Sequence, residues 1–493
     1  MGPQPSAAVS VVDAAPRAGR GRRTVLGTGQ RHREPPLPTL VAAAVVLALT
    51  SLALPSAPGY DPWSWLVWGR EVAAFDLSTS EGPAWKPLPV MVTTVLAVLG
   101  EELAPAGWLV VARAGAILAT LLAFVLARRL AGGSRAAGLA AAFGLLLVPG
   151  WVEGAAVGMG EGLLVAFLLL AAVRALDGQP GAAFALGFVA ALLRVETWPF
   201  LAALGALWVR RDRGALGPVA LAAAGLAVLW FVPELLGSGD ALRSADRARV
   251  PNPGAPALAS HPALATVATT LRLAPAVALG GVVALAVAAP LRSAARGCGR
   301  EALVVAGAGG AWVLLVAAMS EAGFSGEARY LLPGAALLTI VGAAAPFTLA
   351  SALPAPPGRA ARGALAAGVA LTLALTAIGR SDELRAGFER VAYGAALAAD
   401  LERAVARAGG ARSLVRCGPP YVGPYRGPML AWALGLHKAR IGFEPSRPGV
   451  AFRSRLGPDS TIAPAAPAGG SRLSARTALW RIEGVCGGER ERR

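Results

Sequence analysis

Residues 107–130 read GWLVVARAGAILATLLAFVLARRL, with one internal charge, Arg113, and the basic pair Arg128 and Arg129 near the end. As an α-helix this run is about 36 Å long, more than the roughly 30 Å hydrocarbon core of a bilayer. Basic residues at the end of a membrane helix usually face the cytoplasm. The run therefore predicts a transmembrane helix whose C-terminal end lies inside the cell.

The composition extends this prediction to most of the chain. Of 493 residues, 55% are hydrophobic and 15% are charged, which is typical of polytopic membrane proteins. We predict an all-α polytopic protein of about eleven transmembrane helices, from the length of apolar run that a bilayer requires. The predicted spans are residues 37–54, 107–130, 135–149, 160–176, 181–193, 197–209, 215–236, 264–290, 301–319, 329–350 and 361–379.

The formal net charge of +17 would favour nucleic-acid binding in a soluble protein. Here the basic residues form short clusters between apolar runs, so we interpret them as topology determinants and expect no nucleic-acid partner. With these clusters inside, the N-terminus is cytoplasmic and the C-terminus extracytoplasmic. Residues 1–36 contain no apolar run and are expected to form a disordered cytoplasmic tail rather than a signal peptide.

The same topology divides residues 37–380, the predicted membrane domain, into spans and external loops. Residues 55–106 form one wholly external loop, which requires that 87–100 is a juxtamembrane or re-entrant helix. Residues 181–209 become a hairpin of two short helices that turns at 194–196.

Residues 381–493 are less apolar and are predicted to form a small extracytoplasmic domain, either α/β or irregular. About 110 residues suffice for such a domain. Cys417 and Cys486 are the only cysteines in this region. Because an oxidising compartment permits disulfides, we predict that these two residues are bonded.

The external loop 55–106 concentrates the residues suited to chemistry. Asp61, in the sequence YDPWSWLVW, can act as a base or bind a cation, and Lys86, in WKPLP, can meet a phosphate. Three tryptophans follow the aspartate: Trp63, Trp65 and Trp68. Simpler roles stay open, because Asp61 could cap a helix, Lys86 could snorkel to headgroups, and the indoles could form an interfacial belt instead of stacking on a sugar.

Taken in order, four segments resemble the GT-C superfamily of polytopic glycosyltransferases, which take sugars from polyprenyl-phosphate carriers. Asp61 with Trp85-Lys86-Pro87 resembles the first external loop of that family, where an Asp activates the acceptor. VVARAGAILATLLAFVLARRLAG, which contains Arg113, resembles the helix that follows. ALLRVETWPFLAALGALW, which contains Arg194, resembles a short broken hairpin with a basic residue at its turn.

The fourth segment, GEARYLLPGAALL, carries Arg329 and Tyr330 and resembles a late helix start in related membrane mannosyl- and arabinosyltransferases. The four matches together span most of residues 40–350. The resemblance implies that Asp61 is the catalytic base and that the donor phosphate is bound by these residues: Lys86, Arg113, Arg194, Arg329 and Tyr330. Arg194 could instead pair with Glu196, and Arg329 could simply mark a helix start.

Many GT-C enzymes carry a second acidic residue in the next external loop. This chain offers Glu153 and Glu161 as candidates, and the sequence does not decide between them. A divalent cation is accordingly a candidate cofactor, and the histidines show no metal-ligand spacing. No phosphate loop, dinucleotide fingerprint or zinc motif is present.

These features favour an inverting glycosyltransferase in a bacterial plasma membrane, with membrane lipid and a polyprenyl-phosphate sugar as partners. We expect the acceptor to be a component of the cell envelope on the external face. The sequence identifies neither this acceptor molecule nor the sugar. The alternatives are a transporter or flippase for a lipid-linked substrate and a non-catalytic envelope-assembly protein. A transporter needs charges along mid-helix positions, whereas here they gather at outer helix ends.

Overall fold

The computed structural model describes residue 2 and residues 35–291, 298–351, 358–467 and 473–487. The chain divides into two units, residues 1–35 and 36–493. All described helices and strands belong to the second unit. The predicted disordered tail, residues 1–36, lies almost entirely outside the described residues.

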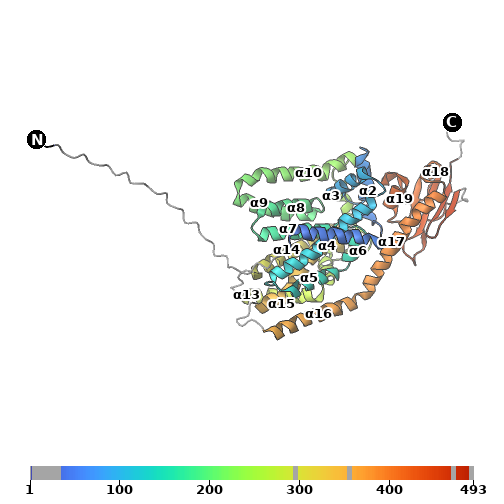
Figure 1. The fold of residues 1–493 in the computed structure, drawn as a ribbon. Helices are drawn as coiled ribbons and strands as arrows, with labels where there is room; N and C mark the ends of the chain where they lie inside the picture. The colour runs from blue at the N-terminus through green and yellow to red at the C-terminus, as the bar shows by residue number, and fades with distance from the viewer. Residues whose placement is uncertain (1, 3–34, 292–297, 352–357, 468–472, 488–493) are drawn as a thin grey trace. The chain divides into compact units, whose positions relative to one another are not determined.

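The predicted apolar runs of residues 37–380 lie on helices, whereas the helices at 60–73, 151–156 and 243–248 were not predicted, and the expected all-α polytopic architecture is confirmed. Figure 1 shows the helices of residues 36–380. They are α1 (Leu37–Thr50), α2 (Tyr60–Ala73), α3 (Pro87–Leu99), α4 (Ala104–Leu130), α5 (Arg135–Leu146), α6 (Trp151–Ala156), α7 (Glu161–Leu176), α8 (Pro180–Ala191), α9 (Trp198–Arg211), α10 (Leu216–Ser238), α11 (Arg243–Ala248), α12 (Pro262–Leu273), α13 (Ala276–Leu291), α14 (Cys298–Glu321), α15 (Ala328–Ser351) and α16 (Arg359–Gly379).

Among the described residues, five helices are long and apolar enough to cross a membrane, or six spans if the bent pair α12–α13 counts as one. The five are Ala104–Leu130, Arg213–Ser238, Gly299–Glu321, Ala328–Ser351 and Arg359–Gly379. The other predicted spans fall on shorter helices, such as α5 and α8. The total of about eleven crossings therefore stays a prediction.

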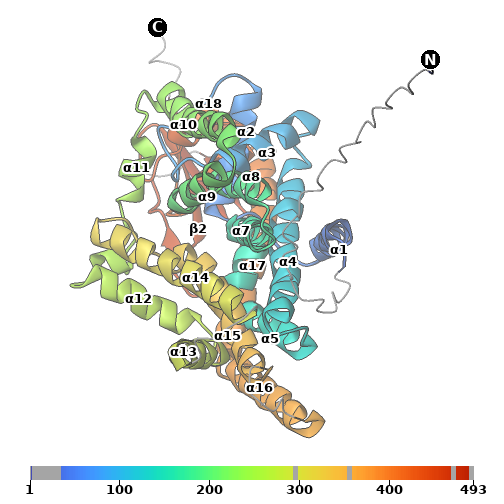
Figure 2. The same cartoon turned by 90° about the vertical axis from the view of Figure 1, so that its left-hand side faces the viewer.

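Helix α4 lies at the centre of the helical core and packs against α1, α5, α7 and α15. Figure 2 shows α1 beside α4 at the edge of the bundle. Contact with α7 depends on two glycines, since a Cβ on Gly115 would lie 2.6 Å from Leu163 Cα and one on Gly162 2.5 Å from Ala116 Cβ. Small residues allow such close approach between membrane helices.

The predicted continuous span 264–290 is wrong in one respect. It is broken into α12 and α13, which are bent by 108° at residues 274–275. Pro275 has no backbone N–H and disfavours helical geometry at the preceding residue. Ala274 is accordingly extended, with φ −73° and ψ 129°.

The loop 55–106 contains two helices, α2 and α3, that pack on one another. Gly69 permits this contact, because a Cβ there would lie 2.5 Å from Thr93 Oγ1. Thr93 in turn donates a hydrogen bond to the carbonyl of Trp65 at 2.7 Å. With 13 residues, α3 is only about 20 Å long, which is consistent with the prediction that residues 87–100 do not cross the membrane.

The C-terminal region begins with α17 (Ser381–Arg407), which leads from α16 to a small sheet (Figure 1). Its other elements are β1 (Pro420–Val422), β2 (Gly449–Arg455), β3 (Ile462–Ala463), β4 (Leu473–Arg476), β5 (Arg481–Val485), α18 (Ala411–Cys417) and α19 (Gly427–Leu434). The strand order is β1-β2-β5-β4, with β3 paired to β2. β1 runs parallel to β2, and β5 is antiparallel to it, with Phe452 opposite Ile482. The domain is therefore α/β.

The structure joins Cys417 to Cys486 by a disulfide, as the sequence predicted. The bond connects the end of α18 to the residue after β5. Helix α17 is held to the same sheet by polar contacts. Trp480 Nε1 donates to the Leu397 carbonyl at 2.9 Å, and Asp400 accepts from the Leu479 N–H at 2.7 Å.

Candidate active site

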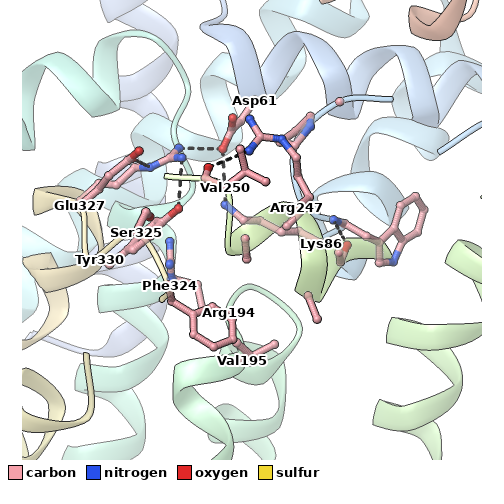
Figure 3. Close-up of a pocket in the computed structure, with 18 of the residues that line it drawn as sticks. Asp61, Lys86, Arg194, Val195, Arg247, Val250, Phe324, Ser325, Glu327 and Tyr330 are labelled. Carbon is pink, nitrogen blue, oxygen red and sulfur yellow. Dashed lines mark hydrogen bonds and ion pairs between the residues drawn. The ribbon is translucent and has the colours of Figure 1, made fainter. Parts of the chain in front are cut away.

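A cavity of about 960 Å³ opens between the predicted external segments of the membrane domain and the C-terminal domain. Its wall combines charged residues from four separate segments with residues of the C-terminal domain (Figure 3). The charged residues are Asp61, Glu81, Lys86, Arg194, Glu196, Arg247, Glu327, Arg329 and Lys438.

Asp61 lies in the first turn of α2 and is 6% exposed. Its Oδ2 atom is 2.7 Å from Arg329 Nη1 and 3.7 Å from Lys86 Nζ. The helix begins after Gly59 without any side-chain cap, so Asp61 does not act as a cap. Burial raises the pKa of Asp61, but Arg329 and Lys86 outweigh it, and the net pKa lies below its usual value. The carboxylate is therefore ionised at neutral pH.

Lys86 immediately precedes α3, and its side chain is 12% exposed. The ammonium lies 5.0 Å from the centre of the Trp65 ring and faces Asp61. Burial lowers the pKa of Lys86, and the charge of Asp61 offsets part of this effect. Lys86 thus points into the protein and does not snorkel to lipid headgroups.

Arg329 and Tyr330 lie in the first turn of α15. Besides Asp61, the Arg329 guanidinium contacts Glu327 Oε2 at 2.9 Å. The Tyr330 ring lies beneath two guanidinium groups, 3.9 Å from that of Arg194 and 5.2 Å from that of Arg329. Tyr330 thus joins the two arginines that come from distant parts of the chain.

Arg194 lines the same cavity but is neutralised by two acids. Its guanidinium contacts Glu196 at 2.6 and 3.1 Å and Glu161 at 3.3 Å. The alternative pairing with Glu196 is therefore present. Of the two candidate acids, only Glu161 lies in this charged group.

Glu153 lies elsewhere and contradicts the expectation that it belongs to the substrate loop. It pairs with Arg390 of α17 at 2.7 and 2.9 Å and is not part of the cavity wall. The reason is that α6 faces α17, so its acid meets the C-terminal domain rather than the charged centre.

Arg113 is also absent from the cavity wall, so the expected convergence of four basic residues is wrong for this one. Its guanidinium donates to the Ser51 carbonyl at 3.0 Å and to the Ala156 carbonyl at 2.8 Å, and it also contacts Ser56. Arg113 ties the end of α1 to α6. The position of Arg113 at the outer end of its helix is therefore not enough to predict whether its side chain faces the cavity.

The tryptophans form neither an interfacial belt nor a sugar platform, since Trp63, Trp65 and Trp68 are 8%, 0% and 0% exposed. They pack on other indoles: Trp63 on Trp432, Trp65 on Trp108, and Trp68 on Trp85. α2 lies under the C-terminal domain, because α19 packs against it. α19 covers Trp63, whereas α4 and the segment before α3 cover Trp65 and Trp68, and the cavity wall includes none of the three.

Sequence reasoning missed several residues of the cavity wall. Arg247 of α11 donates to the Val250 carbonyl at 3.0 Å and has no acidic partner among the described residues. Figure 3 shows Asp61, Lys86 and Arg247 around the same space. Its segment, RSADRARV, lies between the predicted spans 215–236 and 264–290 and carries no recognisable motif. Tyr425 and Phe443 come from the C-terminal domain, and nothing in their local sequence marks them.

The described residues contain no group of three or more His, Cys, Asp or Glu side chains placed to hold a metal ion. The acids of the cavity wall are instead matched to cations: Asp61 to Arg329 and Lys86, Glu81 to Lys438, Glu196 to Arg194, and Glu327 to Arg329. The candidate divalent cation therefore has no set of residues in the described chain that fits it.

No family model matches the chain, and none of the curated proteins matches it. Two similar solved structures are of ArnT from Cupriavidus metallidurans. The structure bound to undecaprenyl phosphate is 16% identical, covering 92% of this chain and 99% of that chain, with a TM-score of 0.49. The apo structure is 18% identical, covering 84% and 92%, with a TM-score of 0.45.

Proposed function

We propose that this chain is an inverting membrane glycosyltransferase of GT-C type. It transfers a sugar from a polyprenyl-phosphate carrier to a cell-envelope acceptor on the external face of a bacterial plasma membrane. The observation that carries the proposal is the cavity itself, where Asp61 meets Lys86 and where Arg247 is a cation without an acidic partner in the described chain.

The donor phosphate fits between Lys86 and Arg247. Arg194 is saturated by Glu161 and Glu196, and Arg329 already contacts Asp61 and Glu327. An incoming anion therefore meets the least competition at Lys86 and Arg247. Ionised donors form the strongest hydrogen bonds to phosphate, and buried ones are screened least.

The isoprenoid tail is apolar and needs apolar walls next to the phosphate. The cavity supplies them from α9, α10, α14 and the segments beside them. The apolar wall residues are Trp198, Trp230, Phe231, Leu242, Val250, Val316, Met319 and Phe324. A cavity with a charged centre and an apolar flank suits an amphiphilic donor.

Asp61 is the catalytic base of the proposed transfer. The acceptor oxygen attacks the anomeric carbon and forms the new glycosidic bond as the bond to the phosphate oxygen breaks. Its electron pair leaves with the polyprenyl phosphate, and the acceptor proton goes to Asp61. A phosphate near Lys86 competes with Asp61 for the ammonium, so donor binding makes the carboxylate a stronger base.

The proposal is tested by lipid analysis of a bacterium from which this gene has been deleted. A polyprenyl-phosphate sugar should accumulate, and the wild-type gene should discharge it. When expressed in the deletion strain, the Asp61→Asn protein should reach the membrane, but the polyprenyl-phosphate sugar should stay accumulated. The Glu153→Gln protein, whose substitution lies outside the cavity, should remove the accumulated lipid as the wild type does. Discharge by Asp61→Asn at the wild-type rate would refute the mechanism, and absence of accumulation would refute the donor class.

A further inference from the structure

Glu234 is a fully buried acid of α10 that sequence reasoning did not single out. Its side chain is 0% exposed, and its two oxygens accept from Arg243 Nε at 2.7 Å and Arg243 Nη2 at 2.9 Å. Ser244 Oγ also donates to Glu234. A buried ion pair contributes little net stability by itself. We therefore looked for a second role of the Glu234–Arg243 pair in the contacts that it makes.

Both partners of Glu234 belong to α11, the segment that carries Arg247, and both also contact the segment that carries Lys86. Arg243 and Arg247 stand four residues apart on α11. Ser244 Oγ accepts a hydrogen bond of 2.6 Å from the backbone N–H of Trp85, the residue before Lys86. The Arg243 guanidinium also donates to the Pro83 carbonyl at 2.9 Å. One buried carboxylate therefore connects the Lys86 segment to the Arg247 segment.

A feature of α10 strengthens the same connection. Pro233 lacks an N–H, which leaves the carbonyl of Leu229 without its usual helical partner. Trp85 Nε1 donates to that carbonyl at 3.0 Å. The Trp85–Lys86 segment is thus fixed to α10 by its side chain and, through Ser244 and Glu234, by its backbone.

We infer that Glu234 is a positioning residue, which sets the separation of Lys86 and Arg247 and thereby preforms the site for a lipid-linked phosphate. The inference rests on the proposed function. Arg243 itself is not part of the cavity wall, whereas Arg247 is. Glu234 consequently acts on the ligand only through the segments that it holds.

The test measures binding of undecaprenyl phosphate to the full chain in detergent, with thermal unfolding recorded on the same samples. Glu234→Gln and Arg243→Gln should each weaken binding about tenfold or more, the scale of one misplaced charged hydrogen bond. Because both act through one contact, the double variant should bind no more weakly than the worse single variant.

Glu153→Gln is the matched control, since it also breaks a two-hydrogen-bond pair with an arginine but lies outside the cavity. Its affinity should stay within about twofold of the wild type, as for exposed pairs. If Glu234→Gln does not fold, Arg243→Lys retains the charge and loses the two-hydrogen-bond geometry. That variant should still weaken binding several-fold, and wild-type affinity would overturn the inference.

Two further results separate the possible failures. If Arg243→Gln weakens binding and Glu234→Gln does not, Arg243 contacts the lipid directly and the positioning role is wrong. A lower unfolding temperature with unchanged affinity would likewise leave Glu234 a structural residue only. If the wild-type chain does not bind undecaprenyl phosphate, the proposed function is wrong, and the positioning role of Glu234 is wrong as well.

Discussion

The cavity is bordered by two charged groups of similar residue types, one around Arg194 and one around Asp61. In the Arg194 group a single guanidinium faces two carboxylates, Glu196 at 2.6 Å and Glu161 at 3.3 Å. In the Asp61 group a single carboxylate faces two cations, Arg329 at 2.7 Å and Lys86 at 3.7 Å. The first group has excess negative charge, whereas the second is balanced, because Arg329 also contacts Glu327.

This difference separates a structural charge from a reactive one. An anion that approached Arg194 would have to displace a carboxylate that already holds it with two hydrogen bonds. Near Asp61, an anion finds Lys86 at a longer distance from its partner and Arg247 without an acidic partner in the described residues. Residue type and burial alone would not have distinguished the two groups.

The largest expected effect follows from removing the charge of Asp61. Asp61→Asn should lower the rate of sugar transfer by about 10²–10⁴-fold, the usual contribution of a general base. Glu161→Gln, in the other group, should leave most of the rate intact. Transfer assays with membranes that contain equal amounts of each variant check this. Equal losses for the two variants would remove the distinction between the groups.

The next effect concerns the Arg194 group and should appear in stability. Arg194→Met leaves Glu161 and Glu196 buried without their cation, which costs about 3–5 kcal/mol in comparable pairs. Thermal unfolding in detergent should detect a clear decrease. Replacing both acids by Gln in the same variant should recover much of it. If the unfolding temperature does not change, the acids are not held by Arg194.

A smaller effect is expected for the cations on the other side. Lys86→Met and Arg247→Met should each weaken binding of undecaprenyl phosphate about 10–100-fold, the range for one charge-assisted hydrogen bond. Arg113→Met is the control, because Arg113 lies outside the cavity wall. Its affinity should match that of the wild type if the protein remains folded. Loss of binding in the control alone would place the phosphate elsewhere.

The smallest effect compares two acids at opposite ends of α2. Burial raises the pKa of both, but Arg329 and Lys86 bring the pKa of Asp61 below its usual value, whereas the pKa of Glu71 stays raised despite the hydrogen bond from the Ser78 N–H and the contact with His437. The stability from Asp61 is thus present above its unfolded pKa and lost as the pH falls through its folded pKa. The stability contributed by Glu71 is present below its unfolded pKa and is lost as the pH rises through its folded pKa.

Unfolding temperatures at pH 2, pH 4 and pH 7 check the two signs. Relative to the wild type, Asp61→Asn should be destabilised at pH 7 and pH 4 and less so at pH 2, because the stability from Asp61 is lost only below its unfolded pKa. Glu71→Gln should gain relative stability from pH 4 to pH 7, because it removes the need to keep a charged carboxylate buried. The same sign for both variants would contradict the opposite pKa directions.

The sequence predicted the helices well because each apolar run is a local property. It also found Asp61, Lys86, Arg329 and Tyr330, since each stands beside a recognisable helix start. The break at Pro275 has a local signal, the proline itself, but the run is apolar on both sides of it and so resembles one continuous span.

Other features depended on contacts between distant segments. Arg113 stands at an outer helix end like the others, but the helix rotation that turns it toward Ser51 and Ala156 is set by packing. The indole of Trp63 packs on Trp432 of α19, more than 350 residues later in the chain. Arg247 reaches the cavity from the segment after α10, and Tyr425 reaches it from the C-terminal domain. No local sequence pattern predicts either position.

The contribution of the C-terminal domain has a consequence for how the protein is made. Tyr425 and Phe443 form part of the cavity wall, and the Arg70 guanidinium of α2 donates to the carbonyls of Trp432 and Leu436 at 3.3 and 3.0 Å. Synthesis and membrane insertion proceed from the N-terminus, so the helices that carry Asp61 and Lys86 are in place long before residue 425 emerges. The cavity wall is therefore completed last, so a nascent chain that still occupies the translocation machinery does not yet have the complete site that the proposed function requires.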